Sequence, residues 1–114
     1  MKLRVLGLAI GWGLVAMIVW LSVTPRPPDL GIEHGDKLGH FAAYGAVTFW
    51  FGQLYARLAT RAAYAAGFIA MGVALEFVQR ALGYRSFEVL DMVADAIGVV
   101  LGFAAVLAAP PLLK

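Results

Sequence analysis

The stretch that decides the fold runs from Val5 to Thr24 and reads VLGLAIGWGLVAMIVWLSVT, twenty residues without a charged side chain. At about 1.5 Å of rise per residue, a helix of this length is about 30 Å long, which matches the hydrocarbon core of a bilayer. Lys2 and Arg4 precede the run, so a cleaved signal peptide is the alternative. The run is longer than most signal-peptide cores and ends without a clear small-residue cleavage site. We therefore expect a retained membrane helix.

The composition of the whole chain supports this expectation. Of the 114 residues, 62% are apolar or aromatic and 14% are charged, and the mean hydropathy is +0.84. Soluble domains carry about 25% charged residues, and a soluble monomer of this size could not cover so much apolar surface. The net charge of +2 is scattered without a basic run, and the chain has no cysteine. These features exclude a water-soluble enzyme, a disordered chain, a nucleic-acid-binding module and thiolate or disulfide chemistry.

Three further apolar segments follow the first. Proline stops the first segment at Pro25 and the last at Pro110, because proline removes a backbone donor and disfavours helix before it. Since lipid admits only helices or closed barrels, segments of this length with short turns predict a helical bundle. We expect an all-α fold, an integral membrane bundle of four transmembrane helices in one domain, residues 1–114, with helices at about 5–24, 38–56, 62–82 and 89–109.

The basic residues near the segment ends indicate an orientation. Five of them gather on the side of the termini, namely Lys2, Arg4, Arg57, Arg61 and Lys114. Four lie on the other side, namely Arg26, Lys37, Arg80 and Arg85. By the positive-inside rule both termini are expected in the cytoplasm, with the chain in the bacterial cytoplasmic (inner) membrane.

Small residues recur at the spacing that lets helix backbones approach closely. Gly7 and Gly11 form one G-x-x-x-G pair, and Gly98 and Gly102 form another. One face of the third helix carries Ala62, Ala66, Ala70 and Ala74. We expect these faces to pack inside the bundle, and a homo-oligomer through the Gly7/Gly11 or Gly98/Gly102 faces is the alternative.

Ionisable groups inside membrane helices are costly, and they are functional candidates by default. Counted from the ends of the segments on the side of the termini, Glu76 and Asp95 both lie about 21 Å along their helices, and His40 lies about 24 Å along its own. Three different helices thus bring a titratable group to one level, roughly 6–9 Å below the outer edge of the core. This coincidence predicts a polar site near the outer face.

Helical spacing adds partners to this site. The catalytic residues, if any, are unknown, and the candidates are Glu76, Asp95 and His40. A metal site from these three side chains lacks the helical H-x-x-x-H or E-x-x-H spacing, so we expect no metal and no cofactor.

A structural role for the polar groups is the alternative, in which they only hold helices together by hydrogen bonds of about 0.6 kcal/mol each. The residues expected to bind a ligand are Asp36, Lys37, His40, Tyr44, Glu76, Gln79, Arg80, Arg85, Ser86, Asp91 and Asp95.

An ordered set of motifs spans nearly the whole chain. It comprises Ser22-x-x-Pro25, Asp36-Lys37-x-x-His40-Phe41-x-x-Tyr44, Glu76-x-x-Gln79 and Arg85-Ser86-x-x-x-x-Asp91-x-x-x-Asp95-x-x-Gly98-x-x-x-Gly102. This set resembles the VanZ-like family of small bacterial membrane proteins. The resemblance implies a role in the cell envelope, since the founding member is associated with low-level resistance to the glycopeptide teicoplanin. The chain departs from the family at Asp95, where many members carry asparagine.

Three functions remain open. The first is an envelope protein whose polar pocket binds or processes a cell-wall, lipid-linked or glycopeptide ligand. The second is a membrane-embedded enzyme acting on a phosphorylated lipid-linked substrate, with Glu76 or Asp95 as general base and His40 as acid or base. In that enzyme the phosphate or carboxylate is held by Lys37, Arg80 and Arg85. The third is a proton-coupled small exporter, which the absence of a carboxylate from residues 5–24 disfavours. The expected partners are membrane lipid and such a ligand, not nucleic acid.

Overall fold

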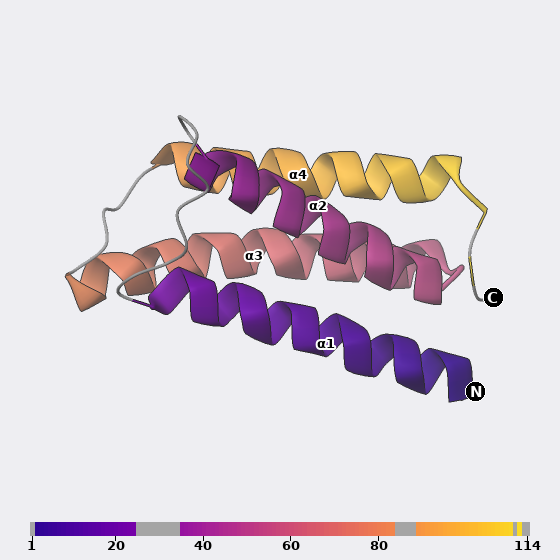
Figure 1. Ribbon diagram of the computed structural model, residues 1–114. Coiled ribbons are helices and arrows are strands. Elements are labelled where there is room, and N and C mark those ends of the chain that lie inside the picture. Colours follow the sequence, from indigo (N-terminus) through magenta and orange to yellow (C-terminus); the bar gives the residue numbers. More distant parts are fainter. Residues whose placement is uncertain (1, 25–34, 84–88, 111, 113–114) are drawn as a thin grey trace.

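The structure is a computed structural model that describes residues 2–24, 35–83, 89–110 and 112. In these residues it is all-helical, as predicted, with no strand. The four helices lie side by side, and α1 starts at the end of the molecule where α4 stops (Figure 1). By length and composition α1, α3 and α4 could each cross a membrane. The helices are α1 (Lys2–Val23), α2 (Gly35–Leu54), α3 (Leu58–Leu82) and α4 (Val89–Ala108).

The helix ends follow from local sequence chemistry. Helix α1 stops two residues before Pro25, and α4 stops two residues before Pro110, as the missing proline donor predicts. Helix α3 ends at Leu82 and is capped by Gly83, whose φ of 81° is left-handed and whose N–H donates to the carbonyl of Gln79 at 3.3 Å. Glycine adopts this conformation without the steric cost of a Cβ, so it closes the helix.

Helix α3 begins at Leu58, four residues before the predicted start, and this difference changes the role of Arg61. Predicted as a charge flanking the membrane, Arg61 lies inside the helix and is only 8% exposed. Its Nε donates to the carbonyls of Gly52 at 2.9 Å and Tyr55 at 2.7 Å. The last carbonyls of a helix have no partner within it and carry partial negative charge, so a guanidinium satisfies them.

A second arginine acts on the same helix end. The Nε of Arg4 donates to the carbonyl of Leu54 at 3.1 Å, and its guanidinium lies 5.2 Å from the centre of the Tyr55 ring. Two arginines from α1 and α3 therefore cap α2. We call this end of the molecule, with Arg4, Arg57 and Arg61, the basic end, and the opposite end, with Glu76, Asp91 and Asp95, the acidic end.

Helix α2 packs most extensively on α4, and glycines let the two backbones touch. A Cβ built on Gly98 would overlap the carbonyl oxygen of Phe41, and one on Gly102 would lie 2.5 Å from the carbonyl oxygen of Gly45. Likewise, a Cβ on Gly45 would lie 3.1 Å from the carbonyl oxygen of Gly98. The predicted close approach at Gly98 and Gly102 therefore occurs within the chain.

The first glycine pair is also used within the chain, between α1 and α2. A Cβ on Gly7 would meet the side chain of Leu54 at 2.5 Å, and one on Gly11 would meet the ring of Phe51 at 2.6 Å.

The alanine stripe of α3 does not pack inside the bundle, contrary to our expectation. Its four alanines are exposed, because α3 turns its opposite face inward, with Arg61, Phe68, Gly72, Glu76 and Gln79 buried.

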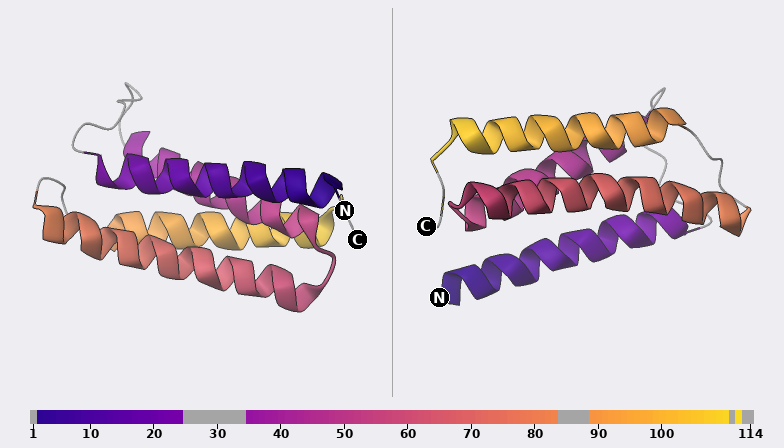
Figure 2. Two further views of the ribbon diagram at one scale, coloured as in Figure 1. Left: turned by 90° about the horizontal axis from the view of Figure 1, so that it is seen from below. Right: turned by 180° about the vertical axis from the view of Figure 1, so that it is seen from behind.

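Helices α1 and α3 meet near the acidic end and diverge toward the basic end (Figures 1 and 2). Near the acidic end the Nε2 of Gln79 donates to the carbonyl of Ser22 at 2.6 Å, and both residues are buried. The hydroxyl of Ser22 donates in turn to the carbonyl of Ile18 at 2.8 Å. This contact ties the end of α1 to α3.

Replacing Gln79 by leucine is expected to lower the free energy of unfolding by about 1 kcal/mol, within the range measured for hydrogen bonds between membrane helices. The loss arises because the leucine cannot donate to the carbonyl of Ser22. Unfolding of the detergent-solubilised protein by titration with a denaturing detergent measures the effect. Val78→Leu, at an exposed neighbouring position, is the control. Equal stability of the two variants would contradict the assigned role of Gln79.

Candidate functional site

A polar cluster lies inside the acidic end and draws two residues from each of three helices. Apart from His40, its members are at most 7% exposed. Such burial of ionisable groups among helices is costly unless the groups are paired or serve a function. The cluster consists of His40 and Tyr44 from α2, Glu76 and Gln79 from α3, and Asp91 and Asp95 from α4.

The most direct contact in the polar cluster joins α2 to α4. The Nδ1 of His40 lies 2.8 Å from the Oδ1 of Asp95, with the side chains 17% and 3% exposed. A carboxylate can only accept a hydrogen bond, so the tautomer of His40 that pairs with an ionised Asp95 carries its proton on Nδ1, and the contact orients the imidazole ring. The predicted common level of His40 and Asp95 is confirmed by this contact.

Asp95 also faces α3, at a glycine that the sequence analysis did not single out. A Cβ built on Gly72 would lie 2.8 Å from the Oδ2 of Asp95, so glycine makes room for the carboxylate. Glu76, 1% exposed, follows Gly72 by one helical turn. The carboxylates of Asp95, Asp91 and Glu76 all act electrostatically on His40. A glycine one turn before a glutamate in an apolar helix is the signal that could have identified this contact.

Tyr44 lies in the same cluster and has an unsatisfied hydroxyl. The residue is 1% exposed, its ring is nearly parallel to that of His40 with centroids 6.3 Å apart, and both Glu76 and Asp95 act on it electrostatically. Its hydroxyl has no hydrogen-bond partner among the described residues. A buried polar group left without a partner costs about 1–3 kcal/mol, so this hydroxyl is available to hydrogen-bond a ligand group or a water.

The structure groups some of the predicted site residues and separates others. Gln79 is in the cluster, but its amide already donates to the carbonyl of Ser22. Arg80 is exposed, so it is not part of the buried cluster. Asp36 and Lys37 belong to the first turn of α2, and their side chains lie outside the described part of the structure. Arg85 and Ser86 also lie outside the described residues.

The chemistry of the cluster follows from its groups. Three carboxyl groups and one imidazole supply mainly hydrogen-bond acceptors, which suit a ligand rich in hydroxyl or amide donors. His40, oriented by Asp95 and partly exposed, can also exchange a proton with such a ligand. Among the described residues, no group of three His, Asp or Glu side chains is arranged to hold a metal ion.

Comparison of the chain with family models, with curated proteins and with solved structures finds no match.

Proposed function

We propose that the chain is a VanZ-like integral membrane protein of the bacterial cell envelope, with four helices crossing the cytoplasmic membrane and both termini in the cytoplasm. The lengths and apolar composition of α1, α3 and α4 support this placement. Helix α2 is the fourth span, since its 20 residues reach about 30 Å and polar side chains such as Thr48 and Gln53 are buried within the bundle. The arginines at the basic end favour the cytoplasmic side for that end.

In this placement the polar cluster lies near the outer face, where it binds a cell-wall, lipid-linked or glycopeptide ligand. The observation that carries the proposal is the unpartnered Tyr44 hydroxyl, enclosed by the same helices as Glu76, Asp95 and His40. Most buried side-chain polar atoms in native proteins have a hydrogen-bond partner, so an unpaired hydroxyl inside the cluster supports a role in ligand binding. His40 is the partly exposed member of the cluster, so a ligand reaches the cluster from the side on which His40 lies.

A second candidate is an enzyme that uses the same cluster on a phosphorylated lipid-linked substrate. The 2.8 Å contact with Asp95 favours it, because a carboxylate that orients an imidazole is a common arrangement for acid–base catalysis. Turnover of a lipid-linked substrate by the purified protein, lost in His40→Ala, distinguishes this activity from binding alone.

The test of the proposed function is glycopeptide susceptibility in cells that express the protein. The wild type is expected to lower susceptibility to teicoplanin. Tyr44→Phe and Glu76→Gln are expected to abolish this effect at unchanged abundance in the membrane, because loss of a hydrogen bond to a charged group weakens binding about tenfold or more. Phe77→Leu, exposed and adjacent to Glu76, is the control that keeps the effect.

Two outcomes would overturn the proposal. If the wild type leaves susceptibility unchanged and also binds no lipid-linked cell-wall precursor, the cluster is not an envelope-ligand site. If the cluster variants disappear from the membrane while Phe77→Leu remains, the cluster serves helix packing alone.

A further inference from the structure

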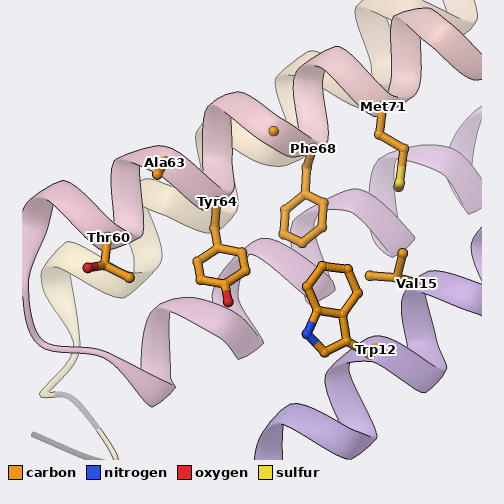
Figure 3. A pocket seen from close by; sticks show the side chains of 8 residues that line it. Trp12, Val15, Thr60, Ala63, Tyr64, Phe68 and Met71 are labelled. Atoms are coloured by element: carbon orange, nitrogen blue, oxygen red, sulfur yellow. The ribbon is translucent and has the colours of Figure 1, made fainter.

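A second feature lies on the other half of the molecule, where α1 and α3 diverge toward the basic end. Between them is a groove of about 320 Å³ (Figure 3). Two of the aromatic rings that line it, Trp12 and Tyr64, pack on the fully buried ring of Phe51, with centroids 5.3 Å and 4.6 Å from that of Phe51. The groove is almost entirely apolar, and its walls include Trp12 and Val15 from α1 and Gly67, Phe68 and Met71 from α3.

The dimensions of the groove match one hydrocarbon chain in one leaflet. From Thr60 to Met71 the groove follows α3 for about 16 Å, roughly half of a 30 Å hydrocarbon core. Toward the acidic end the contact between Gln79 and Ser22 joins the two helices. A Cβ built on Gly67 would meet nothing within 4 Å, so the groove is open at its centre.

The chain is basic at the end of the groove that begins at Thr60. Arg57 is exposed and precedes the first residue of α3, one turn before Thr60. The sequence has no Asp or Glu between Asp36 and Glu76 and none before Asp29, so the basic end has no acidic side chain from α1, the second half of α2 or the first half of α3. Arg57 offers the start of α3 no side-chain cap, and the first turn has no acidic residue. The positive pole of the α3 dipole therefore adds to the charge of Arg57.

We propose that this groove binds one acyl chain of an anionic phospholipid, with the phosphate of the same lipid held at Arg57 and the start of α3. The inference rests on the membrane placement proposed above, but not on the ligand of the polar cluster. The apolar groove selects a hydrocarbon chain, and the basic end selects an anionic headgroup over a zwitterionic one. The occupant is a lipid of the leaflet at the basic end.

Native mass spectrometry of the full chain, titrated with phosphatidylglycerol or phosphatidylcholine in detergent, tests the proposal. The wild type is expected to retain one phosphatidylglycerol in preference to phosphatidylcholine. Gly67→Leu inserts a side chain into the groove and is expected to lose the bound lipid. Gly13→Leu is the matched control, because a Cβ there also meets nothing within 4 Å and Gly13 does not line the groove. Arg57→Gln is expected to lower the preference for phosphatidylglycerol about fivefold.

Each other outcome overturns the inference. If Gly67→Leu and Gly13→Leu retain lipid equally, the groove is not the lipid site. If the wild type retains both lipids equally, the headgroup is not selected at Arg57. If Gly67→Leu instead dissociates a dimer, the occupant is a second copy of the chain. Glu76→Gln is expected to keep the lipid, because Glu76 does not line the groove. If the wild type binds no phosphatidylglycerol but still lowers susceptibility to teicoplanin, this inference is refuted and the proposed function stands.

Discussion

Gly98→Val is expected to lower the free energy of unfolding by about 3 kcal/mol, at the upper end of the usual cost of overpacking. At this position a Cβ would overlap the carbonyl oxygen of Phe41 and lie 3.2 Å from the backbone nitrogen of Gly45. Both contacts are with backbone atoms, which cannot rotate away as a side chain can. The only relief is to move α4 from α2, the most extensive helix contact in the described structure.

Denaturing-detergent titration of the purified variant measures this effect, with Gly13→Val as the control. Gly13 is helical and exposed, and a Cβ there meets nothing within 4 Å, so the same chemical change is expected to leave stability within about 0.5 kcal/mol of the wild type. If both variants lost the same stability, the intrinsic preference of the residues would explain the result, and the close approach of α2 and α4 would be refuted.

Asp95→Ala is expected to cost about 3 kcal/mol, because removing one partner of a buried charge-assisted pair leaves the other without compensation. The His40 ring would lose its acceptor, and a space would open beside Gly72, where Asp95 now fits. Asp95→Asn keeps an oxygen that can accept the proton of His40, so its expected cost is only about 1 kcal/mol.

A double-mutant cycle separates the pair from the rest of the cluster. His40→Ala combined with Asp95→Ala is expected to cost clearly less than the sum of the two single substitutions, because each alone removes the same 2.8 Å contact. Additive costs would show that His40 and Asp95 contribute to stability independently. The contact between them would then add nothing to the free energy of unfolding.

The helices could be predicted because their determinants are local. Apolar runs without charge and the stops before Pro25 and Pro110 depend on neighbouring residues alone. The start of α3 could not be predicted in the same way. Arg61 has the appearance of a flanking charge in the sequence, and only the arrangement of α2 and α3 shows that its guanidinium reaches the carbonyls of Gly52 and Tyr55.

Depth along a helix is the part of the polar cluster that residue spacing predicts. Counting residues placed His40 and Asp95 at one level, and they are in contact. Spacing does not separate Gln79 from Arg80, since both lie within one turn of Glu76. The structure buries the neutral Gln79 and exposes Arg80, in agreement with the higher cost of burying a guanidinium. The orphaned hydroxyl of Tyr44 depends on three helices at once, and no spacing rule reveals it.

The arginine caps on α2 have a consequence for how the chain enters a bilayer. The carboxyl end of α2 is satisfied by Arg4 from the preceding α1 and by Arg61 from the following α3. In the proposed setting Arg4 can cap the end of α2 as soon as α2 lies beside α1, and the second cap forms only when α3 has folded back and placed Arg61 there. The carboxyl end of α2 is then fully satisfied only when the helical hairpin of residues 35–82 has closed against α1.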